Sequence, residues 1–163
     1  MKTSKITLMA LSIAVAMVLS FVESQIPAFV AVPGVKVGLA NIAVMFTLYK
    51  LGWKEAAVIS LVRVFMVSLL FGSAASLFYS AAGAALSLLG MILLKKSGLF
   101  SPVAVSIAGG VLHNVGQIAM ACLLLDTNVI GYYLPFLILS GIAAGIVVGL
   151  AAAVLIKRVT LKI

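Results

Sequence analysis

The chain has 163 residues, of which 65% are hydrophobic and only 9% are charged. A water-soluble domain of this size leaves a large fraction of its surface exposed, so it could not hide that much apolar area. The composition therefore indicates an integral membrane protein and excludes a water-soluble domain. The formal net charge of +8 does not indicate nucleic-acid binding, because lysine and arginine occur at the ends of the apolar segments and not as a stripe on one face.

The apolar segments predict an all-α fold, a single transmembrane domain over residues 1–163 that is built as a bundle of six transmembrane helices. Most segments reach the roughly 20 residues that a helix needs to cross a 30 Å hydrocarbon core. The second segment is short unless residues 35–37 join it. We expect the six helices at about residues 6–23, 37–50, 55–71, 73–94, 103–125 and 132–156.

The first segment also has two features of a secretory signal peptide, because a basic start with Lys2 and Lys5 precedes an apolar run. The run over residues 6–22 is long for that purpose, and no clear cleavage site of small residues follows it. We therefore expect this segment to stay in the protein as the first membrane helix.

The distribution of lysine and arginine predicts the orientation. If the N-terminus is cytoplasmic, the cytoplasmic segments hold nine of the eleven basic residues, the outside receives Lys36, and Arg63 lies inside the third segment. This is the asymmetry that the positive-inside rule requires, so both termini are predicted to be cytoplasmic in a multi-pass protein of the cell membrane. The nine residues are Lys2, Lys5, Lys50, Lys54, Lys95, Lys96, Lys157, Arg158 and Lys162.

Small residues recur at helical spacing in several segments. In lipid, helices associate mainly through close packing, so such residues mark faces where two backbones can approach. We expect most of these faces to be buried within the bundle, although Ala10 and Ala14 could equally face a partner membrane protein. The small residues concerned are Ala10 and Ala14, Ala75 with Gly83 and Gly90, and Gly141, Gly145 and Gly149.

Few polar groups are predicted at membrane depth. Arg63 lies nine residues beyond Lys54, and His113 lies eleven residues beyond Pro102, so the helical rise places both near the midplane. An arginine at this depth is costly unless it finds a partner or water. Glu23 is its one acidic candidate in the outer half, but it lies roughly 10 Å higher, so an ion pair would need both side chains to reach.

A turn-rich stretch precedes the second segment. Pro33-Gly34 is a turn signal, Lys36 follows at the mouth of the segment, and Asn41 lies roughly 7 Å further in. Glu23 falls at a similar outer level, and no ionisable residue is assigned to the inner half. This pattern predicts a binding cavity that opens outward and is closed beneath, and it argues against a channel.

These residues suggest a ligand-binding site. We expect Arg63, helped by the N-terminal end of the second helix near Lys36, to attract an anionic or strongly polar group. The rest of the ligand would then be bound by His113, Asn114 and Gln117. In the alternative interpretation Arg63, His113 and Gln117 form a hydrogen-bonded clamp that holds the third and fifth helices together.

Two motifs resemble a known bacterial membrane family. They read Pro33-Gly34-Val35-Lys36-Val37-Gly38-Leu39-Ala40-Asn41-Ile42 and His113-Asn114-Val115-Gly116-Gln117. Together they resemble the family labelled Gx transporter or heptaprenyl diphosphate synthase component I, and the resemblance covers essentially the whole chain. That family is similar to the S components of energy-coupling factor (ECF) transporters. S components are six-helix membrane proteins that capture a vitamin or related small molecule from outside.

The resemblance implies a substrate-binding subunit that passes its ligand inward with a T subunit and two ATPase subunits. It implies that Ala10 and Ala14 match the small-residue motif by which S components meet the T subunit, and that the outer loop over residues 24–37 gates the site. The chain has no Gly-x-x-x-x-Gly-Lys-Ser/Thr motif, so any ATP-driven step belongs to another chain.

The family label also suggests an accessory membrane subunit of prenyl diphosphate synthesis. That chemistry resembles enzymes that hold magnesium and diphosphate with aspartate-rich motifs, and magnesium needs carboxylate oxygens. The acidic residues Glu23, Glu55 and Asp126 are widely separated, so we expect no catalytic residue, metal site or cofactor in this chain. Cys122 lies in an apolar run and is expected to pack. A purely structural membrane subunit is the third interpretation.

Overall fold

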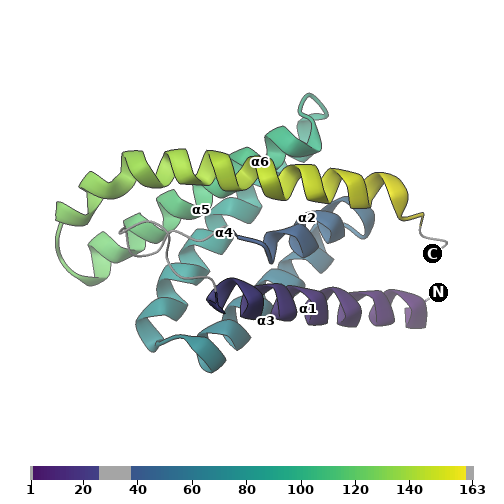
Figure 1. The fold of residues 1–163 in the computed structure, drawn as a ribbon, viewed down its shortest axis with the longest axis horizontal. Coiled ribbons are helices and arrows are strands. Elements are labelled where there is room, and N and C mark those ends of the chain that lie inside the picture. The colour runs from purple at the N-terminus through teal and green to yellow at the C-terminus, as the bar shows by residue number, and fades with distance from the viewer. Residues whose placement is uncertain (1, 26–37, 161–163) are drawn as a thin grey trace.

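The computed structural model describes residues 2–25 and 38–160, which fold as a bundle of helices (Figure 1). These described residues form six α-helices and one short 3-10 helix, and they contain no strand. The all-α prediction is therefore confirmed. The elements are α1 (Lys2–Gln25), α2 (Asn41–Lys50), α3 (Trp53–Phe71), α4 (Ala74–Ser97), α5 (Pro102–Leu124), η1 (Val129–Tyr133) and α6 (Leu134–Arg158).

Four helical stretches are long and apolar enough to cross a membrane, namely Ser4–Gln25, Ala74–Ser97, Pro102–Leu124 and Val129–Arg158. The helix α3 is long enough at 19 residues, but it carries Lys54, Glu55 and Arg63. The helix α2 has 10 residues and is only roughly 15 Å long. A membrane bundle is thus supported, whereas six complete crossings and cytoplasmic termini stay predictions.

The second helix begins later than the sequence predicted. It starts at Asn41 and not at residue 37, because Gly38 has a φ of +74° and its backbone cannot continue a right-handed helix. The remaining helices begin and end within four residues of the predicted bounds. Serine caps fix two of these starts, since the hydroxyls of Ser73 and Ser101 accept hydrogen bonds from the first turns of α4 and α5.

The short helix α2 lies at the centre of the bundle. Half of its residues are buried, and Val44, Met45 and Leu48 belong to the main apolar core. That core also includes Ile59 of α3 and Val105 of α5. Figure 1 shows α2 between α1 and α6. Burying this helix places its N-terminal end inside the bundle, next to the cavity described below.

The helix α5 packs closely against both α4 and α6 through glycines. A Cβ added to Gly145 would lie 2.5 Å from the Cα of Ile107, and one added to Gly116 would lie 2.8 Å from the carbonyl oxygen of Ala82. Such approaches leave no room for a side chain. The predicted close faces at Gly83, Gly141, Gly145 and Gly149 are therefore confirmed, whereas Gly90 lies against the side chain of Leu112.

One of the small-residue predictions needs correction. Ala75 is exposed at the start of α4 and takes no part in the glycine contacts. Ala10 and Ala14 are also exposed and do not pack within this bundle, so the alternative that they face a partner stays a prediction. The buried stripe of α1 consists of Ser12, Ala16 and Ser20. This stripe also has a spacing of four residues, but it lies on another face of the helix.

Both termini of the bundle point to the same side of the view in Figure 1. Near the N-terminus, Lys5 Nζ lies 2.5 Å from Glu55 Oε1 and links α1 to α3. Lys95 Nζ donates a hydrogen bond of 2.6 Å to the carbonyl oxygen of Leu48, so it satisfies one carbonyl at the C-terminal end of α2. Lys5 and Lys95 thus form contacts between helices, in addition to their place in the predicted charge asymmetry.

Candidate functional site

A cavity of about 820 Å³, including the part that opens to solvent, lies among helices α2 to α6. Asn41 and Met45 come from α2, and Arg63, Val64 and Val67 come from α3. The helix α4 adds Ser80, Ser87 and Met91, and α6 adds Gly141, Ala144, Gly145 and Val148.

The wall formed by α5 is polar along its whole length. Its lining residues are Ser106, Gly109, Gly110, His113, Asn114 and Gln117. Spacings of three and four residues place them on one helical face, and eleven residues of rise make this stripe roughly 16 Å long. The sequence predicted the shared face of Gly110, His113 and Gln117, and all three line the cavity.

The guanidinium of Arg63 lies inside the bundle at this cavity. Its Nη1 atom donates a hydrogen bond of 3.0 Å to Oδ1 of Asn41, the first residue of α2. Its Nε atom is buried and has no hydrogen-bond partner within the described part of the chain. A buried cation with an unused donor is costly, so it favours an additional acceptor at this place.

Glu23 lies close to this pair but does not line the cavity. Its carboxylate accepts a hydrogen bond from the backbone N–H of Gly38, just before α2. It also interacts electrostatically with Arg63. The start of α2 thus contacts both neighbouring helices, since Gly38 bonds to Glu23 of α1 and Asn41 bonds to Arg63 of α3.

Asn114 holds two helices together. Its Nδ2 atom donates hydrogen bonds to the carbonyl oxygen of Leu137, at 2.5 Å, and to Oγ of Ser140, at 3.4 Å. Both acceptors belong to α6, so the amide nitrogen of this cavity residue is already engaged. Two cavity residues thus link helices, Arg63 between α3 and α2 and Asn114 between α5 and α6. The clamp between the third and fifth helices stays a prediction.

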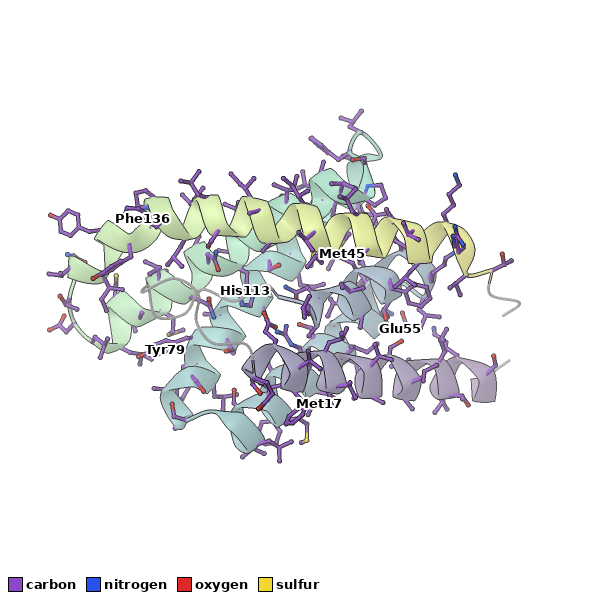
Figure 2. All side chains as sticks on the ribbon, in the orientation of Figure 1. Met17, Met45, Glu55, Tyr79, His113 and Phe136 are labelled. Atoms are coloured by element: carbon purple, nitrogen blue, oxygen red, sulfur yellow. The ribbon has the colours of Figure 1, made fainter. Side chains whose placement is uncertain are left out.

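His113 and Gln117 face α4 at Gly83. A Cβ on Gly83 would lie 2.8 Å from Cγ of Gln117 and 3.2 Å from Cε1 of His113. Figure 2 shows His113 and Met45 toward the middle of the bundle, and Phe136 at its periphery. Both residues also line the cavity.

Lys36 was also predicted to contribute to the site. It lies outside the described residues, together with Pro33 and Gly34 of the first motif. The end of that motif is described, and it supplies Gly38 and Asn41 to the cavity wall.

Sequence reasoning missed the serines Ser80, Ser87 and Ser106, and the methionines Met45 and Met91. Ser106 could have been found, because it lies seven residues before His113 and so shares its face. The residues on α2 and α4 carry no comparable signal, since their place depends on how the helices pack.

The described residues contain no group of three His, Cys, Asp or Glu side chains that could hold a metal ion. Glu55 pairs with Lys5 at the start of α3, and Asp126 lies beyond the end of α5. Cys122 is a half-buried free thiol on α5. The acidic residues are thus distributed over three separate places.

An all-helical bundle with four helices long enough to cross a membrane, and with a polar cavity among them, defines a multi-pass membrane protein. The chain belongs to the family described as heptaprenyl diphosphate synthase component I, whose model matches residues 12–155. This confirms the resemblance carried by the two motifs. Comparisons with curated proteins and with solved structures gave no match.

Proposed function

We propose that this protein is the substrate-binding subunit, similar to an ECF S component, of an uptake transporter for a small anionic molecule. The main support is Arg63, which lines the cavity and whose buried Nε atom has no partner among residues 2–25 and 38–160. An anionic group of a ligand would supply the missing acceptor and the missing charge.

The electrostatics of the cavity favour such a group. Its described lining contains Arg63 but no aspartate or glutamate. Asn41 opens α2, and the N-terminal end of a helix carries a partial positive charge. A short helix that ends inside a membrane bundle is a recurrent way to place such a terminus at an anionic substrate.

The proposal also includes the orientation of the protein in the membrane and its partner subunits. If both termini are cytoplasmic, a ligand would reach Arg63 from the outer face of the bacterial cell membrane. The chain carries no ATP-binding loop motif, so a T subunit and ATPase subunits would supply the driving force. The exposure of Ala10 and Ala14 on α1 is compatible with a contact to the T subunit.

The test is to identify the small molecules that stay with the protein during purification in mild detergent. Mass spectrometry would compare the wild-type protein with Arg63→Ala, and with Arg158→Ala as a control at the exposed end of α6. We expect an anionic compound with the wild type and with the control, but not with Arg63→Ala. A compound retained equally by all three proteins would contradict the role of Arg63.

The family description favours a second candidate, an accessory membrane subunit of heptaprenyl diphosphate synthesis. In this role the chain would be non-catalytic, because Glu23, Glu55 and Asp126 occupy three separate places and cannot jointly hold magnesium and diphosphate. Recovery of a prenyl lipid with both the wild type and Arg63→Ala would favour this candidate.

A further inference from the structure

We propose that Ser87 and Ser106 form a second, deeper subsite in the cavity, which binds a neutral hydrogen-bonding group of the ligand such as a hydroxyl, an amide or a ring nitrogen. The inference rests on the proposed function, because it describes the other end of the ligand whose anionic group Arg63 would bind. It adds two residues that neither motif contains.

The two serines lie together where α4, α5 and α6 meet. A Cβ on Gly109 would lie 3.3 Å from Oγ of Ser87, and Gly109 is one turn along α5 from Ser106. A Cβ on Gly149 would lie 3.0 Å from Cβ of Ser106, which places this serine against α6 as well. Both serines line the same cavity as Arg63.

Their hydroxyl groups are available to a ligand. Ser87 and Ser106 are each only 4% exposed. Serines in helices commonly donate to a carbonyl one turn earlier, as Ser97 donates to Leu94 and Ser140 to Leu137. Among the described residues, Ser87 and Ser106 have no such bond. A buried hydroxyl without a protein partner favours an acceptor or donor from the cavity.

The subsite lies deeper than the arginine. Met45 follows Asn41 by one turn of α2, roughly 6 Å, and it packs in one core cluster with Met91 and Val105. Ser106 directly follows Val105, so the serines lie about one turn or more below the pair of Arg63 and Asn41. A ligand that reached both places would separate its anionic and neutral groups by roughly 6 to 10 Å.

The surroundings define what kind of group fits there. Met45, Met91 and Val148 line the cavity near the serines, and no charged residue of the described lining lies at this depth. An ionised group would find no opposite charge here. An apolar ring with one polar edge would pack against the methionines and Val148 and form a hydrogen bond with the serines. A long hydrocarbon chain would leave both hydroxyls unpaired.

A pair of matched probes tests the inference. Binding of 3-(4-hydroxyphenyl)propanoate and of 3-phenylpropanoate, which differ in one hydroxyl, would be measured by equilibrium dialysis with the purified full chain in detergent. We expect the wild-type protein to bind the hydroxylated probe roughly two- to tenfold more tightly. The double variant Ser87→Ala, Ser106→Ala should bind both equally, whereas Ser60→Ala, a buried serine outside the cavity lining, should keep the preference.

The outcomes separate the two proposals. Equal binding of both probes by the wild type, with loss of both in Arg63→Ala, would overturn the serine subsite and leave the anion site standing. A preference that persists in the double variant would also overturn the subsite. Failure of the wild type to bind either probe would overturn the anion site, and the subsite with it. Circular dichroism and thermal unfolding would establish that each variant is folded.

Discussion

Arg63 and Asn41 join α3 to the first residue of α2 inside the bundle, through a hydrogen bond of 3.0 Å between Nη1 and Oδ1. The bond satisfies one donor of a buried guanidinium and leaves the Nε atom without a partner among the described residues. It also fixes the start of the shortest described α-helix at the cavity wall. The positive group is thereby held in place at the cavity.

Replacing Asn41 with aspartate should abolish anion binding without unfolding the protein. The new carboxylate would pair with Arg63 and occupy the guanidinium that the ligand needs. We expect thermal unfolding to stay near or above the wild-type temperature, while binding of 3-phenylpropanoate in equilibrium dialysis is lost. Asn41→Ala is the matched variant, and it should be destabilised by about 1 kcal/mol but retain binding. Unchanged binding by Asn41→Asp would exclude contact between the probe and Arg63.

Replacing Glu23 with glutamine should strengthen anion binding. The side-chain oxygen of glutamine can still accept the hydrogen bond from the Gly38 N–H, but the negative charge that interacts with Arg63 disappears. An anion then meets less competition for Arg63, so we expect a severalfold tighter dissociation constant in equilibrium dialysis. Glu23→Ala also loses the acceptor for Gly38 and should unfold at a lower temperature. Weaker binding by Glu23→Gln would show that the carboxylate itself contacts the probe.

Replacing Asn114 with alanine should destabilise the bundle. The variant loses the hydrogen bonds from α5 to Leu137 and Ser140 on α6, and it leaves a carbonyl with one partner fewer in an apolar setting. We expect a loss of about 1 to 3 kcal/mol in the free energy of unfolding, measured by denaturation in detergent. Asn128→Ala, at an exposed position before η1, is the control and should change little. Equal stability of the two variants would refute the clamp.

Replacing Gly145 with alanine should separate α5 from α6. The added Cβ would lie 2.5 Å from the backbone of Ile107, and neither backbone can move without losing other contacts. Overpacking of this kind costs about 1 to 3 kcal/mol, which a lower unfolding temperature would report. Gly131→Ala offers a control, because nothing lies within 4 Å of its added Cβ. A Gly145→Ala protein as stable as the wild type would show that the two helices are not held this closely.

Cysteine labelling in intact cells tests the predicted orientation. In a Cys122→Ser background, an impermeant maleimide should label Asn128→Cys from outside and Ser97→Cys only after the membrane is permeabilised. Both positions are exposed, and α5 separates them. The opposite pattern would invert the orientation. Labelling of both from one side would mean that α5 does not cross the membrane.

The sequence by itself determined the class of the molecule and much of one wall of its cavity. Apolar runs and their ends predict helices, because hydrogen bonding within a helix depends on local sequence. The spacing of Gly110, His113 and Gln117 predicts their shared face for the same reason. Glycines at intervals of four on α6 likewise mark its contact with α5, since only small residues allow such an approach.

Only the tertiary structure decided which of these faces meet. The partner of Arg63 lies 22 residues away on another helix, and Ser87 of α4 lies against Gly109 of α5. The spacing of small residues does not determine which of two stripes on α1 is buried. In the structure Ala10 and Ala14 are exposed, whereas Ser12 and Ala16 are buried. Such pairings depend on packing between segments that are far apart in the sequence. The pattern within one segment does not determine which other segment packs against it.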